Sequence, residues 1–159
     1  MEVANILAPE SVCFEAGVRS KKHALELLSD VLADAANIDD AEEVFESLVQ
    51  RERLGCTGLG KSIAMPHTRL DGLEETIGAF IRLDDGVDFD AADGEPVDLI
   101  FGLLLPAHSG DEQIREVKEL IAKLGDSELQ KQLHDAAKPA ELYNLLTKSL
   151  TIIHRTLTT

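Results

Sequence analysis

Apolar residues recur at helical spacing in two segments near the start of the chain. In residues 21–36 they fall three or four positions apart, as on one face of a helix. A second such pattern begins at Asp40 (or Asp39) and runs to about Arg53, where Gly55 follows as glycine often does after a helix. The first third of the chain is therefore predicted to form two helices, each with one buried face.

The middle of the chain changes to short apolar runs, which are typical of strands. Strands are expected at residues 12–14, 63–65, 76–83 and 97–105. The last of these is apolar at nearly every position, which indicates a central strand covered on both faces. Asp84, Asp85 and Gly86 are expected to form a turn.

Helical patterns return after the strands. Three further helices are expected, at about residues 111–124, 127–136 and 139–148. Helices on both sides of a block of strands favour a three-layer α/β/α domain with a mixed sheet. We predict one domain over residues 1–148 and a flexible, threonine-rich tail at 149–159.

Composition and charge limit the function. Hydrophobic residues are 44% and charged residues 28% of the 159 residues, as in folded domains. The formal net charge of −15 repels nucleic-acid phosphates and anionic membranes, so we expect no nucleic-acid binding. The same charge favours basic partners, or it reflects a high-salt cytoplasm.

The sequence contains no pattern for a membrane span, a disulfide framework or a zinc site. No apolar stretch approaches transmembrane length, and no basic segment followed by an apolar run opens the chain. Cys13 and Cys56 lie far apart and form no CxxC motif. We expect a cytoplasmic protein that is not membrane-embedded and holds no metal.

A glycine-rich segment follows the second expected helix and admits two interpretations. Residues 55–62 read GCTGLGKS and match the phosphate-loop pattern GxxxxGK[ST]. That motif requires a strand before it and a helix after it, whereas here a helix precedes it and Pro66 would break a helix begun at Lys61. An irregular glycine loop is the favoured interpretation, and a nucleotide-binding enzyme is the alternative.

Pro66 and His67 form a more informative pair. Proline fixes its own backbone angle and restricts the residue before it, so the histidine is held beside the glycine-rich loop. A neutral imidazole is nucleophilic near pH 7, because the unperturbed pKa of histidine is about 6.5. His67 is therefore a candidate acceptor of a phosphoryl group.

The residues around this pair resemble a known family. Residues 51–60 (RERLGCTGLG) and 63–67 (IAMPH) are similar to the active-site block of the fructose/mannitol/nitrogen-type IIA proteins of the sugar phosphotransferase system, the type-2 EIIA domains. Residues 96–106 (PVDLIFGLLLP) resemble the central strand of that family, and residues 140–143 (AELY) also fit. The resemblance covers about residues 5–147, and its long ordered block is specific.

The resemblance implies that His67 carries the phosphoryl group on Nε2. Arg51 matches the active-site arginine of the family, and a guanidinium pairs well with phosphoryl oxygens; a solvated arginine at a helix end is the alternative. Lys61 and Arg69 either add local positive charge or are solvated. No cofactor is implied, because the donor is already a high-energy phosphohistidine.

The glycine-rich loop is expected to support the phosphoryl group. The backbone amides of Gly58 and Gly60 are candidate donors to it. Thr57 either orients His67, donates to the phosphate or caps the loop.

The sequence departs from the family at a second histidine, which members usually carry early in the helix after the central strand. Gln113 occupies that position. Its amide can donate to a phosphoryl oxygen but carries no positive charge, so we expect slower transfer or a longer-lived phosphorylated state, which suits signalling. His108 either substitutes for the missing histidine or is an exposed loop residue.

The resemblance also implies partners. The main expectation is a phosphocarrier that accepts its group from the carrier HPr, or the nitrogen-branch counterpart of HPr, and passes it to a IIB or permease component for fructose-like sugar uptake. The alternative is a nitrogen-type regulatory protein whose phosphorylation state at His67 controls partner binding.

Overall fold

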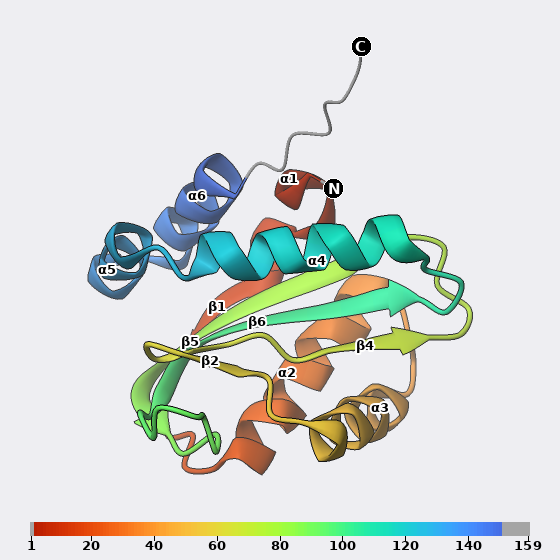
Figure 1. The fold of residues 1–159 in the computed structure, drawn as a ribbon, viewed down its shortest axis with the longest axis horizontal. Helices are drawn as coiled ribbons and strands as arrows, with labels where there is room; N and C mark the ends of the chain where they lie inside the picture. The colour runs from red at the N-terminus through yellow and green to blue at the C-terminus, as the bar shows by residue number, and fades with distance from the viewer. Residues whose placement is uncertain (1, 151–159) are drawn as a thin grey trace.

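In a computed structural model, which describes residues 2–150, the chain forms a six-stranded sheet with helices on both faces (Figure 1). The strands are β1 (Val12–Glu15), β2 (Gly58–Gly60), β3 (Ile63–Ala64), β4 (His67–Leu70), β5 (Ile77–Val87) and β6 (Val97–Pro106). The helices are α1 (Val3–Ile6), α2 (Lys21–Ala36), α3 (Ala41–Leu54), α4 (Asp111–Leu124), α5 (Ser127–Asp135) and α6 (Pro139–Ser149), with a 3-10 turn at Pro9–Ser11.

The sheet is mixed, as the sequence predicts. Its order is β1-β5-β6-β3-β2, and β4 also pairs with β6. β5 and β6 are antiparallel, whereas β1 is parallel to β5, and β3 and β4 are parallel to β6. β6 is thus the central strand, and its side chains are buried on both faces of the sheet.

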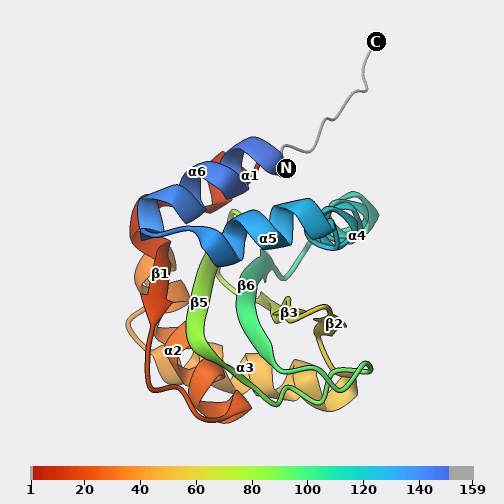
Figure 2. The ribbon, with the colours of Figure 1, turned by 90° about the vertical axis from the view of Figure 1, so that its left-hand side faces the viewer.

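The helices form two outer layers around this sheet. α2 and α3 cover one face, and α4, α5 and α6 cover the other (Figure 2). Alternate residues of β6 serve the two cores: Phe101 and Leu103 belong to the α4–α6 side, and Ile100 and Leu104 to the α2–α3 side. Each such buried side chain stabilises the fold by about 1.5–3 kcal/mol. The three-layer α/β/α prediction is confirmed.

Local capping explains where the first long helices begin. Ser20 accepts a hydrogen bond from the backbone N–H of His23 at 3.0 Å, and Asp40 accepts one from Glu42 at 3.0 Å; such caps stabilise a helix by about 1 kcal/mol. α2 also packs closely on β6 at Gly102, where an added Cβ would lie 2.7 Å from Leu28. The predicted helices over residues 21–36 and 40–53 are confirmed.

β3 and β4 lie end to end along one edge of β6 in a single register. Ile63 is opposite Leu99 and His67 is opposite Leu103. Pro66 interrupts the pair because it has no N–H, but its carbonyl accepts from Leu103 N at 3.0 Å. The sequence predicts the first of these strands and misses the second, in which His67 is the first residue.

One prediction about a loop is wrong, and a second is right only in part. Asp84, Asp85 and Gly86 continue β5 to Val87 instead of forming a turn. The three residues are exposed, and the pairing with β6 shifts between Arg82 and Val87, so the carboxylates of Asp84 and Asp85 reach water within an irregular strand.

The glycine-rich segment is also more regular than expected, since Gly58–Gly60 forms β2, which pairs antiparallel with β3. The predicted single domain over 1–148 stays a prediction. Most of the expected tail, residues 151–159, lies outside the described residues. Within residues 2–150, no helix is long and apolar enough to cross a membrane.

Candidate functional site

A cavity of about 220 Å³ opens at the edge of the sheet beside β4. In Figure 1, β4 runs between α3 and α4. β2 pairs with β3 and, in the part of the chain that the structure describes, no strand pairs with the outer edge of β4. The cavity is lined by one residue of α3, three of β4, one of β6 and one of α4, namely Arg51, His67, Thr68, Arg69, Leu105 and Ile114.

The ring of His67 is fixed by a backbone carbonyl. Its Nδ1 lies 2.9 Å from the carbonyl oxygen of Met65. A carbonyl only accepts hydrogen bonds, so Nδ1 must carry the proton. In the neutral ring the lone pair is therefore on Nε2, which is the nitrogen left to act as a nucleophile.

The surroundings of His67 keep its ring neutral. Burial lowers the pKa of His67 below its ordinary value of 6.5, and the positive charge of Arg51 lowers it further. The hydrogen bond to Met65 and the negative charge of Glu52 oppose these effects but do not cancel them. A neutral imidazole at physiological pH is the form that can attack phosphorus.

Arg51 makes the cavity suitable for an anion. It lies in the last turn of α3, where its Nη1 donates to the carbonyl of Gly55 at 2.9 Å. Arg69, from β4, adds a second guanidinium to the lining. The hydroxyls of Ser47 and Thr68 lie 2.8 Å apart and join α3 to β4, which fixes Arg51 relative to His67. The sequence-predicted pair, Arg51 and His67, is brought together.

The structure places Thr57 elsewhere than in this cavity. Thr57 is only 4% exposed, and its hydroxyl donates to the carboxylate of Glu52. Its backbone N–H donates to the same carboxylate at 3.3 Å. Of the alternatives that the sequence leaves open for Thr57, a direct contact with the phosphoryl group is not supported, because its hydroxyl is hydrogen-bonded to the end of α3.

Gly58 and Gly60 also lie outside the cavity lining. The N–H of Gly58 donates to Sγ of Cys56 at 3.2 Å. Gly60 has a positive φ of 85°, and a Cβ added there would meet the Asp93 carboxylate at 3.1 Å. A carboxylate so close to Gly60 is unfavourable for a phosphoryl group.

Lys61 and Ser62 form a tight hairpin turn between β2 and β3. Both have positive φ angles, 55° and 72°, and the N–H of Lys61 donates to Asp93 at 2.8 Å. Lys61 Nζ approaches the carbonyl of Gly125 at 3.4 Å instead of the His67 cavity. No helix begins after Ser62, so the context that a phosphate loop requires is absent.

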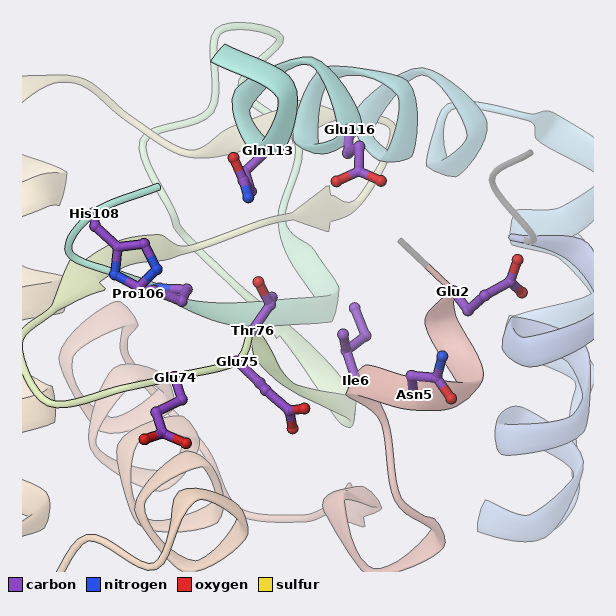
Figure 3. A pocket seen from close by; sticks show the side chains of 10 residues that line it. All are labelled: Glu2, Asn5, Ile6, Glu74, Glu75, Thr76, Pro106, His108, Gln113 and Glu116. Carbon is purple, nitrogen blue, oxygen red and sulfur yellow. The ribbon is translucent and has the colours of Figure 1, made fainter. Parts of the chain in front are cut away.

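Gln113 and His108 line a second cavity, of about 480 Å³ (Figure 3). Gln113 Oε1 accepts from the N–H of Gly110 at 3.0 Å at the start of α4. Four carboxylates share the lining of this cavity: Glu2, Glu74, Glu75 and Glu116. The structure does not bring Gln113 or His108 into the lining of the His67 cavity.

Sequence reasoning gives no role to Glu52, Thr68, Leu105 or Ile114. Glu52 stands within the block that resembles the family, but nothing in the sequence shows where its side chain points. Leu105 and Ile114 become neighbours of His67 only when β4, β6 and α4 come together. Within residues 2–150, no group of three or more His, Cys, Asp or Glu side chains is placed to hold a metal ion.

These features define a class of protein: a mixed α/β domain with one neutral, oriented imidazole beside two guanidinium groups at a sheet edge. The sequence matches, over residues 5–149, the family described as "Phosphoenolpyruvate-dependent sugar phosphotransferase system, EIIA 2". The chain belongs to this family and is thus an EIIA-type component of that phosphotransfer system, as its resemblance implies.

Individual relatives include both nitrogen regulatory proteins and a sugar-specific EIIA component. A nitrogen regulatory protein of Pseudomonas aeruginosa is 38% identical over 92% of this chain and 95% of its own length. The crystal structure of nitrogen regulatory protein IIA-Ntr from Neisseria meningitidis superposes with a TM-score of 0.82 at 34% identity, over 91% of this chain and 98% of that one. A fructose-specific EIIA component of Haloferax volcanii is 29% identical over 92% of this chain and 96% of its length.

Proposed function

We propose that this protein is a phosphocarrier of the nitrogen-regulatory kind, in which the phosphorylation state of His67 selects partners. The geometry that carries the proposal is the Nδ1–Met65 hydrogen bond, because it leaves Nε2 as the nucleophile beside Arg51. The similarity to proteins named as nitrogen regulatory proteins is greater than to the fructose-specific component. This favours regulation over the sugar uptake that was our main expectation from sequence.

The proposed step is an in-line transfer between two histidines. Nε2 of His67 attacks the phosphorus of a phosphohistidine on an HPr-like donor, and the P–N bond of the donor breaks as the new P–N bond forms. Nδ1 of His67 keeps its proton, and the donor ring, which is protonated on its other nitrogen, takes the electron pair of the broken bond and departs as a neutral imidazole. The guanidinium groups of Arg51 and Arg69 stabilise the charge on the three equatorial oxygens.

This step needs no added general base. The nucleophilic nitrogen is already unprotonated, because the pKa of His67 is lowered by burial and by Arg51. The phosphoryl group then passes to a IIB or permease component, or it stays and alters the binding of a regulatory target. A cytoplasmic location is part of the proposal.

Phosphoryl labelling tests the acceptor. The protein is mixed with phosphorylated HPr, or with the phosphorylated nitrogen-branch counterpart of HPr. The mass of the intact chain is then measured by mass spectrometry under conditions that preserve acid-labile phosphate. We expect one added phosphoryl group in wild type, none in His67→Ala, and wild-type labelling in His23→Ala, which removes an exposed histidine of α2. Equal labelling of wild type and His67→Ala would exclude His67 as the acceptor.

Partner capture tests the regulatory role. His67→Ala and His67→Asp are compared as baits, the second carrying a negative charge in place of the ring. A regulator should retain different partner sets with the two baits. Identical sets, together with rapid passage of the label to a IIB component, would favour the second candidate, a sugar carrier, for which the similarity to the fructose-specific component of Haloferax volcanii is the specific support.

A further inference from the structure

A buried carboxylate lies behind the His67 cavity. Glu52 is next to Arg51 on the last turn of α3, but Arg51 lines the His67 cavity and Glu52 lines a separate groove between α2 and α3. The side chain of Glu52 is only 6% exposed. A carboxylate removed from water to this degree requires compensating partners.

Glu52 has those partners, and two of them come from Thr57. Lys21 Nζ lies 2.8 Å from Oε1 of Glu52. The backbone N–H of Thr57 donates to Oε1 at 3.3 Å, and the hydroxyl of Thr57 donates to Oε2. The carboxylate thus fixes both the backbone and the side chain of Thr57, at the point where the chain enters β2.

A continuous series of hydrogen bonds joins Thr57 to the reactive ring. The carbonyl of Thr57 accepts from the N–H of Met65 at 3.0 Å. The carbonyl of Met65 accepts from Nδ1 of His67 at 2.9 Å. Met65 is fully buried, so its two backbone polar groups have no water to replace these partners. The orientation of the imidazole therefore depends on the position of Thr57.

We propose that Glu52 is a positioning residue for phosphoryl transfer: it anchors Thr57, which holds the backbone of Met65, which orients the ring of His67 and fixes its proton on Nδ1. The inference rests on the proposed function of His67. Glu52 does not contact the transferred group, and its effect passes through the backbone hydrogen bond between Thr57 and Met65 and the bond from the His67 ring to the Met65 carbonyl. Lys21 supports it from α2 and also donates to the carbonyl of Phe89 at 3.3 Å.

The direction of the pKa shift separates this role from a loss of packing. The negative charge of Glu52 and the Met65 hydrogen bond both raise the pKa of His67, whereas burial and Arg51 lower it. Removing the carboxylate should lower the pKa of His67 further. A merely loosened structure would expose the ring and move the pKa up, toward the ordinary value.

The experiment follows the ring nitrogens of His67 by NMR in the full chain as pH is varied. Glu52→Gln is compared with wild type and with Glu46→Gln, which removes an exposed carboxylate from the same helix. We expect Glu52→Gln to lower the pKa of His67, to reduce the fraction of neutral ring protonated at Nδ1, and to slow labelling at pH 7 by at least about tenfold. Glu46→Gln should change none of these. An unchanged tautomer, or a pKa that moves up, would overturn the proposal.

Two variants of Thr57 give an independent test, should Glu52→Gln fail to fold. Thr57→Ser keeps the hydroxyl that donates to Glu52, and Thr57→Val removes it while keeping a similar shape. We expect the Nδ1 tautomer to be lost in part in Thr57→Val and retained in Thr57→Ser. Equal spectra for the two would overturn the inference. The NMR readout needs no phosphoryl donor, so absent labelling of wild type would count against the proposed function alone.

Discussion

The two cavities at the end of β6 are lined by neighbouring residues and have opposite charge. Leu105 and Ile114 line the cavity of His67, whereas Pro106 and Gln113, the adjacent residues of the same strand and helix, line the other. The first contains the guanidinium groups of Arg51 and Arg69. The second contains four glutamates (Figure 3).

The difference between the two cavities shows that the net charge of the whole chain does not predict the local charge of the His67 cavity. A step of one residue along β6 and along α4 separates a cavity lined by two guanidinium groups from one lined by four carboxylates. The chain carries a net charge of −15, yet its candidate phosphoryl acceptor lies in a locally positive cavity. The expectation that partners are basic therefore applies to the acidic surface and not to the entrance beside His67.

The largest effect predicted from this comparison concerns the positively charged cavity of His67. Arg51→Ala should slow phosphoryl transfer to His67 by about 10²-fold, because it removes a donor to the charge of the transition state. Arg53→Ala is the matched control: Arg53 is two residues along α3 and lines the groove of Glu52 instead. The measurement is the initial rate of labelling from a phosphorylated carrier. Similar losses in the two variants would show that general positive charge, and not placement in the cavity, is what matters.

A smaller effect is predicted for a substitution in the cavity lined by four glutamates. Gln113→Ala should change the labelling rate by less than about threefold, because the side chain lies outside the His67 cavity. It should nevertheless lower the free energy of unfolding by about 1 kcal/mol, since its amide oxygen caps the N–H of Gly110. Labelling kinetics and denaturant unfolding measure the two quantities. A tenfold loss of rate would mean that Gln113 reaches the phosphoryl group during transfer, as its place in the family pattern implies.

Much of the fold was predictable because its elements are long and strongly patterned. Residues 21–36 have one apolar face and a capping serine, and the apolar run of β6 requires cover on both sides. β4 was missed because His67, Thr68 and Arg69 are polar and only their pairing with β6 makes them a strand. β5 extends past Leu83 because exposed acidic residues can occupy an irregular stretch of strand, and its pairing with β6 resumes at Val87.

The sequence predicts those parts of the site that depend on which residues stand in one block of the chain. It does not predict those that depend on where a side chain points. Arg51 and His67 stand in a block that resembles a family, and their types suit phosphate chemistry. Thr57 stands in the same block, yet its hydroxyl points to the buried carboxylate of Glu52. The position of Gln113 relative to His67 depends on how β6 and α4 are placed, and residue types alone do not contain that information.

The smallest predicted effect is a dependence of stability on pH that arises in the positive cavity. The pKa of His67 is lowered in the folded protein, chiefly by burial, whereas the unfolded chain has a pKa of about 6.5. Below that value the unfolded chain binds more protons than the folded one, so protonation favours unfolding. The stability associated with the neutral ring is fully present above the unfolded pKa. It is lost as the pH falls from there through the folded pKa.

His67→Gln removes this linkage, so the difference in melting temperature, wild type minus variant, should be larger at pH 7.5 than at pH 5. Arg51→Ala removes one of the causes of the lowered pKa and should weaken the pH dependence of wild type in the same interval. His23→Gln changes an exposed histidine of α2 and should leave that dependence intact. A difference between wild type and His67→Gln that is constant, or grows on acidification, would show that the folded protein does not favour the neutral imidazole. The contrast between the two cavities would then be one of composition without a consequence for proton binding.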